Sequence, residues 1–398
     1  MLFSLLRTYV LQWAGERVMD VMDTLDKLQL LATQYEPAEE TTVAGTVVPS
    51  KSAYKLSGCI FEAATPHGRV PLLKTLLTSA CERDCFYCPF RAGRNFRRAT
   101  LRPDELAQTF EAMYRAGLVK GLFLSSGIIG GGVRTQDRLL ATAELLREKY
   151  GFRGYLHLKL MPGAERAQVE RAMQLADRVS VNLEAPSTER LARLAPHKMF
   201  TEELLRPLRW VEEIRREQGG RGPSQVTQFV VGPAGESDYE LLATTDMLYR
   251  ELRLARAYYS AFSPVPDTPL DGHVPTPPLR ERRLYQASFL LRDYPFRLSD
   301  LAFNADGNLP LDVDPKAAWA QRHLAERPVE INRAGREELL RIPGIGPKGA
   351  EAILKARRQG ALRDLADLRK IGVIPERAAP YILLAGRRPA YQLALLGG

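Results

Sequence analysis

Short apolar runs alternate with longer amphipathic stretches between residues 72 and 263, and the alternation repeats six times. This pattern is typical of βα units, in which a helix connects each strand to the next parallel strand. The first helical stretch carries Pro103 in its first turn with acidic residues behind it, a recognisable helix start. The expected strands are 72–78, 121–125, 154–160, 178–184, 225–231 and 257–263, and the expected helices are 103–116, 136–149, 165–176, 201–218, 237–252 and 278–294.

Six parallel strands can form an open doubly wound sheet or an incomplete (β/α) barrel. In a sheet with helices on both faces, both sets of alternate side chains should be mainly apolar. Here one set is polar on two successive strands, as expected where side chains point into a barrel interior. The alternative is that these residues are solvated because they lie near strand ends. The polar residues are His157, Lys159, Ser180, Asn182 and Glu184.

Beyond the sixth strand the chain is rich in proline from 264 to 278, which predicts a loop with little regular structure. A helix and a mixed segment around 309–315 lead to a last unit that starts near Val329. The sequence therefore predicts four parts. They are an N-terminal helical extension at 1–60, the βα array at 61–295, a linker segment at 296–328 and a small all-α domain at 329–398.

The composition is that of an ordinary globular protein, with 45% hydrophobic and 26% charged residues, and a length of 398 residues predicts more than one domain. The net charge of +9 is concentrated in the tail. From Arg333 onward 13 Lys and Arg stand against 6 Asp and Glu, whereas the rest of the chain has 43 against 41. Such a basic tail suggests a polyanionic partner, and a solvated basic face is the alternative.

No apolar run reaches the roughly 18 residues of a membrane span, so no membrane association is expected. Residues 2–6 are apolar, but Arg7 interrupts them and no small-residue cleavage site follows. This argues against a secretory signal and for a cytoplasmic protein. Residues 1–20 are expected to form an ordinary helix or to precede a true start at Met19 or Met22.

Three of the four cysteines stand in one short loop after the first expected strand, as Cys81-x3-Cys85-x2-Cys88. Three thiolates at this spacing can bind three irons of a four-iron cluster and leave the fourth iron open, whereas a structural zinc site requires four ligands. The alternative is a zinc knuckle completed by Cys59 or His67. Cys59 has no partner at a suitable spacing, so we expect no disulfide framework and a reducing compartment.

A second motif stands in the basic tail, where the run I-P-G-I-G-P-K at 342–348 separates two helical stretches. The segment resembles a helix-hairpin-helix, a DNA-binding unit without sequence preference. Gly344 and Gly346 allow a tight turn, so main-chain N–H groups at the start of the next helix can point at a phosphate, together with Lys348. A weaker second copy is expected around 368–374. The alternatives are a fortuitous turn and a hairpin that serves only protein contacts.

The cysteine loop on the first of six βα units resembles the radical SAM superfamily, whose core is a partial (β/α)6 TIM-like barrel. The resemblance implies a [4Fe-4S] cluster bound by Cys81, Cys85 and Cys88, with S-adenosylmethionine (SAM) chelating the open iron. It implies reductive cleavage of SAM to a 5′-deoxyadenosyl radical that abstracts a hydrogen from the substrate. An electron donor such as flavodoxin or ferredoxin is then an expected partner.

The resemblance also implies a SAM pocket at the strand ends. Tyr87 occupies the family's aromatic position near the adenine, although it could simply fill the loop. Leu124-Ser-Ser-Gly127 stands where many members carry Gly-Gly-Glu, and the glutamate is missing. The expected SAM-binding residues are Tyr87, Ser125, Ser126, Gly127, Asn182, Glu184 and Gly232, and the expected substrate-side groups are His157, Lys159 and Tyr259.

Segments from about Met22 to Pro389 resemble one radical SAM family, described as DNA modification or repair proteins. Its members are commonly encoded beside a uracil-DNA-glycosylase-like protein, a further partner that the resemblance suggests. The leading interpretation is a radical SAM enzyme that acts on nucleic acid, with DNA as the expected target. The alternatives are a non-catalytic Fe-S repair accessory that binds DNA and a radical SAM enzyme that modifies RNA. The resembling segments are 77–81, 121–127, 154–159, 177–182, 258–261, 283–287 and the hairpin tail.

Overall fold

The chain forms two compact units. The computed structural model describes residues 24–31, 54–55, 59–65 and 68–390. The first unit comprises Met1–Glu236 and Met247–Thr276, and the second comprises Ser237–Asp246 and Pro277–Gly398.

The division between the units passes through a helix and differs from the boundaries that the sequence suggested. The second unit takes in the first half of helix α8 (Asp238–Leu252) and starts again at Pro277, whereas we expected a boundary at residue 295. Most of the expected extension at 1–60, including Met19 and Met22, lies outside the described residues. Within the extension, the described residues 24–31 are helical.

The first unit is built on one sheet whose strands follow each other in sequence order. All six expected strands are present, and each pairs in parallel with its neighbours. A doubly wound sheet would need a reversal of strand order, which does not occur here, so the partial barrel is confirmed. The strands are β3 (Gly68–Leu76), β4 (Gly121–Ser125), β5 (Tyr155–Lys159), β6 (Arg178–Ser180), β7 (Ser224–Val231) and β8 (Arg256–Ala261).

Strand β6 is shorter than the expected 178–184, but its pairing with β7 continues beyond its end. The Leu183 N–H donates a hydrogen bond to Thr227 Oγ1 at 3.2 Å. The Glu184 N–H donates to the Gln228 carbonyl at 2.9 Å. The polar segment after Ser180 is therefore held at the sheet edge even though it is not regular strand.

An antiparallel addition to the sheet was missed in the sequence. Strands β1 (Tyr54–Lys55) and β2 (Ile60–Thr65) precede β3, and β2 pairs with β3 along its whole length. The first parallel strand was expected to start at residue 72, but β3 starts at Gly68 and includes Pro71. In the structure Pro71 pairs only with β2, ahead of the pairing between β3 and β4, and a proline is tolerated at such a position.

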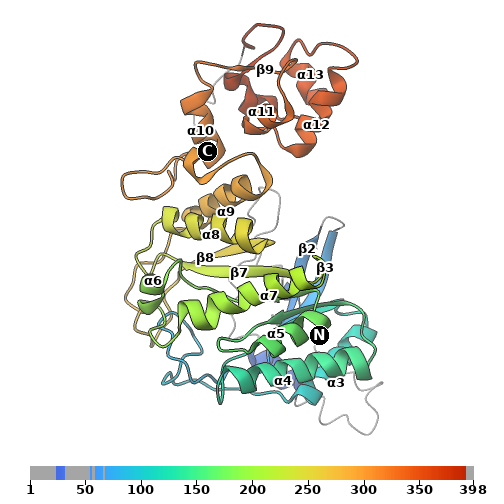
Figure 1. Ribbon diagram of the computed structural model, residues 1–398, viewed down its shortest axis with the longest axis vertical. Coiled ribbons are helices and arrows are strands. Elements are labelled where there is room, and N and C mark those ends of the chain that lie inside the picture. Colours follow the sequence, from blue (N-terminus) through green and yellow to red (C-terminus); the bar gives the residue numbers. More distant parts are fainter. Residues whose placement is uncertain (1–23, 32–53, 56–58, 66–67, 391–398) are drawn as a thin grey trace. The chain divides into compact units, whose positions relative to one another are not determined.

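The connecting helices form one layer outside the sheet, because right-handed crossovers between successive parallel strands place them all on the same face. Helix α3 packs on α4, α4 on α5, and α5 on α7, as Figure 1 shows. In α3, Leu106, Phe110 and Met113 share one buried stripe at helical spacing. The helices are α3 (Pro103–Arg115), α4 (Gly132–Glu144) with a π-helical turn (Leu145–Lys149), α5 (Arg166–Leu175), α6 (Thr188–Ala192), and α7 (Arg206–Glu217) after a second π-helical turn (Phe200–Leu205).

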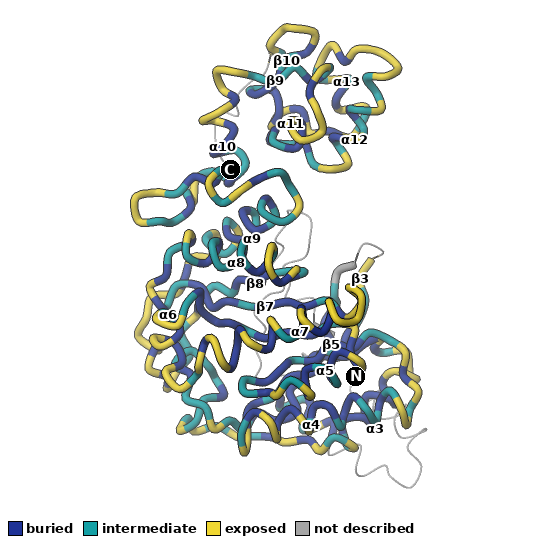
Figure 2. Tube along the Cα trace, viewed as in Figure 1, coloured by how far each residue is buried: buried dark blue, intermediate teal, exposed yellow. Residues whose placement is uncertain are grey.

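The two faces of the sheet differ in chemistry. Leu122, Leu124, Leu156 and Leu158 belong to the set of side chains that faces the helices, and all four are fully buried. Figure 2 shows the strands as a buried layer. Because alternate side chains point to opposite faces, the polar set on β5 and β6 lies on the other, inner face, as predicted.

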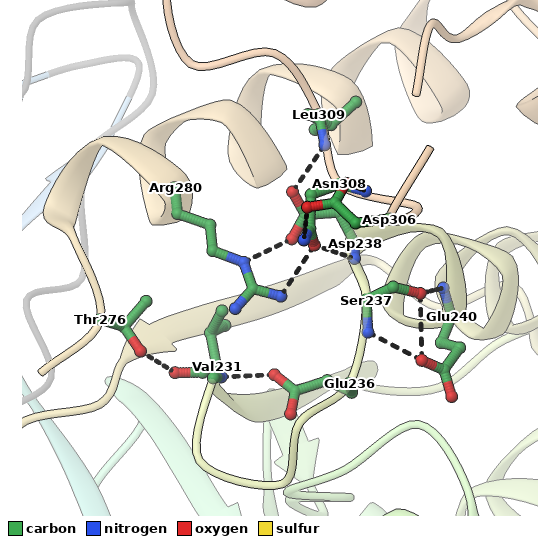
Figure 3. A network of polar contacts seen from close by, with 11 residues as sticks. Val231, Glu236, Ser237, Asp238, Glu240, Thr276, Arg280, Asp306, Asn308 and Leu309 are labelled. Atoms are coloured by element: carbon green, nitrogen blue, oxygen red, sulfur yellow. Dashed lines mark hydrogen bonds and ion pairs between the residues drawn. The ribbon is translucent and has the colours of Figure 1, made fainter. Parts of the chain in front are cut away.

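The second unit contains helices α9 (Pro278–Asp293) and α10 (Pro315–His323) and the hairpin helices. The buried Asp238 carboxylate accepts hydrogen bonds from Arg280 Nε at 2.8 Å and from the Leu309 N–H at 2.9 Å (Figure 3). Asn308 accepts a further bond from the Asp238 N–H at 3.1 Å. This network joins the start of α8, the start of α9 and the loop at 306–309 into one polar core.

The hairpin region is mainly helical, with one short addition to the expected all-α domain. Strands β9 (Val329–Glu330) and β10 (Ile382–Leu383) pair in parallel and join the two ends of the region. Within the described residues no helix is long and apolar enough to cross a membrane. The hairpin helices are α11 (Arg336–Arg341), α12 (Pro347–Ala356), α13 (Leu365–Lys370) and α14 (Pro375–Ala378).

Candidate active site

The three cysteines lie on a loop that leaves the carboxyl end of β3. Backbone N–H groups point at two of their sulfurs: Phe90 N lies 3.4 Å from Cys88 Sγ, and Ile128 N lies 3.4 Å from Cys81 Sγ. The Cys88 N–H donates to the Cys85 carbonyl at 3.2 Å, which turns the loop back on itself. N–H groups directed at sulfur stabilise thiolates, and such bonds tune the potential of iron-sulfur clusters.

The donor set fits a four-iron cluster better than a zinc ion. Among the residues that the structure describes, no three His, Cys, Asp or Glu side chains come close enough to share one metal ion. Cysteines that hold a cluster lie farther apart, because each binds a different iron. Cys59 lies at the start of β2, where its carbonyl accepts from Lys74 on β3, and the other candidate fourth ligand, His67, lies outside the described residues.

All four cysteines are free, as expected. Burial raises the pKa of Cys88 to about 12 and also places the pKa of Cys85 above its usual value. Buried thiolates therefore need positive charge beside them, and the irons of a cluster would supply it. Cys81, Cys85 and Cys88 are the residues that would hold the cluster.

The Ser-Ser-Gly segment after β4 packs directly against the cysteine loop. The Gly127 N–H donates to the Thr78 carbonyl at 2.8 Å, and a Cβ at Gly127 would lie 2.2 Å from the Ala80 carbonyl oxygen. Only glycine therefore allows this approach beside Cys81. The Ser126 hydroxyl turns to the Gly127 carbonyl at 2.7 Å. Ser125, at the end of β4, is buried.

The glycines that follow are used for loop packing. Gly130 and Gly131 both have positive φ, and their N–H groups donate to the Glu82 carboxylate at 2.8 and 3.0 Å. Glu82 lies between the first two cysteines. The two loops are thus tied together by bonds that involve no cysteine sulfur.

A buried cation, which was not predicted from the sequence, lies beside the cluster loop. Lys198 Nζ lies 3.4 Å from Glu184 Oε1 and donates to the Tyr87 hydroxyl at 3.4 Å. The Lys198 and Glu184 side chains are only 10% and 9% exposed. Burial acts to lower the pKa of Lys198, but Cys85 and Glu184 outweigh it, so the pKa lies above its usual value and the amine is charged.

Lys198 is positioned by bonds between its segment and the cysteine loop. Arg83 donates to the His197 carbonyl at 2.6 Å, and the His197 ring lies 2.7 Å from the Asp84 carboxylate. The Phe86 N–H donates to the Leu194 carbonyl at 2.7 Å. Two residues of the C-E-R-D-C-F-Y-C run, Arg83 and Asp84, therefore serve to dock the lysine. No spacing rule in the sequence connects position 198 with position 85.

Glu184 carries unusual backbone geometry. Its φ of +63° is in the left-handed region, which a non-glycine residue rarely adopts and which is often found at functional sites. Neighbouring strand residues hold it on both sides, since its N–H bonds to Gln228 and its carbonyl accepts from the Val230 N–H at 2.8 Å. Lys198 contacts both Glu184 and Tyr87, so the structure brings these two predicted residues together.

The substrate-side candidates separate into two groups. His157 and Lys159 lie on the inner face, where His157 Nε2 is 2.9 Å from Ser180 Oγ. Burial lowers the pKa of His157 well below its usual value and that of Lys159 to about 8. Tyr259 instead belongs to the helix-facing set: it pairs with Phe229, stacks on that ring at 5.9 Å, and is buried. The structure therefore does not bring Tyr259 to the face that carries His157.

Two further predicted pocket residues lie at the same sheet edge. Asn182 is half-buried in the polar segment between Ser180 and Glu184. Gly232 follows β7 with a φ of +109°, and its N–H donates to the Glu236 carboxylate. The Gly232 N–H is thus already bonded within the protein. Gly232 can therefore contribute to a pocket only by leaving space where another residue would have a side chain.

The predicted hairpin forms in the second unit. Gly344 has a φ of +81°, and Gly346 precedes α12, whose first turn carries the exposed Lys348. The second copy also forms, between α13 and α14, and its Gly372 has a φ of +79°. At the position of Lys348 it carries Glu376, which is ion-paired with an arginine of α13. The two hairpins share a backbone but differ in charge.

Comparisons with known proteins agree with this geometry. The family model of the radical SAM superfamily matches residues 75–248, and that of the helix-hairpin-helix motif matches residues 325–380. The first match covers the cysteine loop and strands β4 to β7. No curated protein matches the chain.

Solved structures with related folds have low sequence identity to this chain. Methylornithine synthase (PylB) is 14% identical, with 72% of each chain covered and a TM-score of 0.45. The FeFe-hydrogenase maturase HydG from Carboxydothermus hydrogenoformans is 14% identical over 56% of this chain and 51% of its own, with a TM-score of 0.42. The methyltransferase TsrM from Kitasatospora setae, with cobalamin and a [4Fe-4S] cluster bound, is 14% identical over 51% and 36%, with a TM-score of 0.39.

The chain thus spans about half the length of HydG and about a third of TsrM. The assignment rests on the family model together with the cysteine loop, which lies within the matched residues. This chain contains a radical SAM domain, the enzyme domain that uses a [4Fe-4S] cluster and S-adenosylmethionine, followed by a helix-hairpin-helix motif.

Proposed function

We propose that this radical SAM enzyme acts on nucleic acid, with DNA as its target. The observation that carries the proposal is the helix-hairpin-helix on the same chain as the radical SAM domain, with the exposed Lys348 in the first turn of α12. Backbone N–H groups at a helix start and a nearby lysine bind phosphate without reading bases. Such a unit suits an enzyme whose substrate is a polymer with repeated phosphates.

In the radical SAM domain, the bound cofactors supply a 5′-deoxyadenosyl radical that abstracts hydrogen. The residues of this chain bind and orient the cluster and SAM. Cys81, Cys85 and Cys88 hold the cluster, and the pair of Glu184 and Lys198 offers one charge of each sign to the amino and carboxylate groups of SAM. Their burial strengthens these interactions, because water screens them little.

The reaction, the compartment, the electron donor and the protein partner are part of the same proposal. The enzyme modifies or repairs DNA in the cytoplasm, receives its electron from flavodoxin or ferredoxin, and works with a uracil-DNA-glycosylase-like protein. A reducing compartment agrees with four free cysteines, of which Cys59 and Cys85 are buried and have raised pKa values.

The proposal is tested with the full chain, reconstituted anaerobically with iron and sulfide and reduced with dithionite. We expect 5′-deoxyadenosine from SAM, and we expect its yield to rise when duplex DNA is added. An intact cluster that yields no 5′-deoxyadenosine with any nucleic acid would contradict the enzymatic function. If SAM also leaves the EPR spectrum of the reduced cluster unchanged, the chain is the DNA-binding accessory instead.

The choice between DNA and RNA needs a separate measurement. Dissociation constants for duplex DNA and structured RNA are compared at the same salt concentration, since phosphate contacts make both strongly salt-dependent. Tighter binding of DNA is the expected result. Tighter binding of RNA, with RNA also giving more 5′-deoxyadenosine, would replace DNA by RNA as the target.

A further inference from the structure

A lysine from outside the helix-hairpin-helix motif reaches the turn of the first hairpin. Lys316 lies in the first turn of α10, ahead of the matched residues 325–380, and its Nζ donates to the Ile345 carbonyl at 2.6 Å. The same Nζ lies 4.8 Å from the centre of the Tyr294 ring at the end of α9. A Cβ at Gly346 would be 3.4 Å from the Tyr294 hydroxyl. Segments from α9 and α10 therefore meet at the hairpin turn.

The position of the Lys316 amine is unfavourable for a positive charge. It is half-buried, and the positive end of the α10 dipole lies beside it. Within the described chain, no carboxylate lies at ion-pair distance from it. The acid at the start of its own helix is already bonded, since Asp314 accepts the Ala317 N–H at 3.0 Å with one oxygen and pairs with Arg377 through the other.

The charged groups around Lys316 come from the elements that pack against it. Asp314 belongs to α10 and Arg377 to α14, whereas Tyr294 from α9 offers only its ring. Burial lowers the pKa of Lys316 to about 7, with Arg377 acting in the same direction and Asp314 against it. An anion beside the amine would raise this pKa, so binding of the anion would be coupled to uptake of a proton.

The hairpin offers further hydrogen-bond donors at the same turn. Among the described residues, none accepts a hydrogen bond from the N–H groups of Gly346, Lys348 or Gly349 at the start of α12. An ammonium has three N–H groups, and the Ile345 carbonyl takes one of those on Lys316. Unbonded main-chain donors together with a cation that lacks a counter-charge suit a phosphate.

We infer that Lys316 is a second phosphate-binding cation of the first hairpin, held at the Ile345 carbonyl and acting with the first N–H groups of α12 on one backbone phosphate of the DNA. This inference rests on the proposed action on nucleic acid. It gives DNA affinity and protein stability opposite dependences on pH. Phosphate binding needs the protonated amine and weakens as the proton is lost, whereas folding a half-buried amine is easier without the proton.

The first test measures the affinity of the full chain for duplex DNA by fluorescence anisotropy at about pH 6.5 and about pH 8.5, at one salt concentration. Wild type should bind about 3- to 10-fold more tightly at the lower pH, the size of one phosphate contact. Lys316→Met should bind equally at both pH values, with the affinity of wild type at the higher pH. Because the fold gains stability over this range, unfolding cannot explain the weaker binding.

A second readout is the salt dependence at the lower pH. Lys316→Met should lower the slope of log K against log salt by about 0.9, as expected for one lost contact. Lys355→Met is the matched control, because it removes an exposed lysine from the last turn of α12, at the end away from the hairpin. This control should keep the wild-type slope and the wild-type pH dependence.

The outcomes separate the inference from the function on which it rests. Wild-type affinity that does not change with pH, or a pH dependence that Lys316→Met retains, would overturn the role of Lys316 and leave the DNA target standing. Weaker binding of Lys316→Met by the same factor at both pH values would also overturn it, because Lys316 would then only shape the hairpin. Failure of wild type to bind any nucleic acid would overturn both. Thermal melting identifies a variant that does not fold, and the pH dependence of wild type then decides.

Discussion

Positive charge is presented in opposite ways in the two units. On the inner face of the radical SAM domain, Lys74 is 9% exposed and Lys198 is 10% exposed, and each is surrounded by fixed neighbours. In the hairpin region, Lys348 extends into solvent from a short turn. Desolvating a charge is costly, whereas an exposed lysine costs almost nothing. A buried cation therefore needs a counter-charge beside it, as Glu184 is for Lys198, whereas an exposed lysine needs none and suggests phosphate binding only through the hairpin geometry around it.

The basic excess of the tail overstates what is available for binding. The Arg341 guanidinium lies over the rings of Phe296 and Trp319, at 4.9 and 4.7 Å from their centroids, and donates to the Pro295 carbonyl. Arg357 donates to the Ala334 carbonyl at 2.6 Å. These cations hold the unit together. The comparison therefore predicts that substitutions can reduce SAM cleavage and DNA binding separately, and that substitutions of buried residues have the larger effects.

The largest effect is expected from removing a cluster ligand. Cys85→Ala should lower 5′-deoxyadenosine formation to background and reduce the iron content, because a three-cysteine site has no spare ligand. Binding of duplex DNA should be unchanged, as measured by fluorescence anisotropy. A parallel loss of DNA binding would show that the two units do not act separately.

A smaller effect is expected at the buried ion pair. Glu184→Gln keeps the shape but leaves Lys198 without its carboxylate, and losing one partner of a buried charge pair costs about 2–5 kcal/mol. SAM cleavage should fall by about 10- to 100-fold while the cluster remains, as checked by iron analysis. Glu189→Gln, at an exposed pair on α6, is the control and should have no effect. Full activity of Glu184→Gln would remove this pair from the site.

At the hairpin the expected change is in affinity and salt dependence. Lys348→Gln should weaken DNA binding by about 3- to 10-fold and lower the slope of log K against log salt by about 0.9, the contribution of one phosphate contact. Lys370→Gln removes the same charge from an exposed residue that is paired with Asp367, and should change neither quantity. If the two variants behave alike, the hairpin contributes only general charge.

The two hairpin glycines offer a matched pair for stability. Both have positive φ, but a Cβ at Gly344 would lie 2.7 Å from the Ile374 carbonyl oxygen, whereas a Cβ at Gly372 would meet nothing within 4 Å. Gly372→Ala should cost about 1 kcal/mol of unfolding free energy from its backbone conformation alone, and Gly344→Ala more, about 2–3 kcal/mol. Denaturant unfolding measures the difference. Equal losses would mean that the contact with Ile374 relaxes easily.

The last expected effect is a pH dependence in the second unit. Burial lowers the pKa of Lys316 to about 7, and its amine donates to the Ile345 carbonyl in the hairpin at 2.6 Å. Because the unfolded chain binds this proton up to its ordinary pKa near 10.4, unfolding takes up a proton between these values. Stability should therefore rise from pH 7 toward pH 10, by less than about 1.4 kcal/mol per pH unit. Lys316→Met should flatten this rise, as seen in melting temperatures.

The fold was predictable because each βα unit carries its own local pattern. The six strands and their helices were found to within a few residues, and the polar alternation at His157 and Lys159 correctly gave the inner face. Tyr259 was misplaced because Tyr258 and Tyr259 are adjacent, and only the register with Phe229 shows which of them faces the helices. The sequence alone does not show which face of the sheet a side chain takes when two adjacent residues of a strand are both aromatic.

The site was predictable only in part. The cysteines have a recognisable spacing, but Lys198 reaches them through the Arg83 and Asp84 contacts of a segment far along the chain. The expected linker at 296–328 also proved to contain α10, whose Lys316 bonds to the hairpin. Both features depend on tertiary contacts that leave no periodic signal. Hairpin glycines, in contrast, were visible because their backbone conformation restricts the residue type.

The bonds from Glu82 to Gly130 and Gly131 have a consequence for how the enzyme acquires its metal. They hold the cysteine loop in shape without using any sulfur, and Arg83 and Asp84 add further anchors. These bonds fix the backbone of the loop without any bond to a cysteine sulfur. Loss of the cluster should therefore leave the loop in its conformation, able to bind iron and sulfide again without refolding.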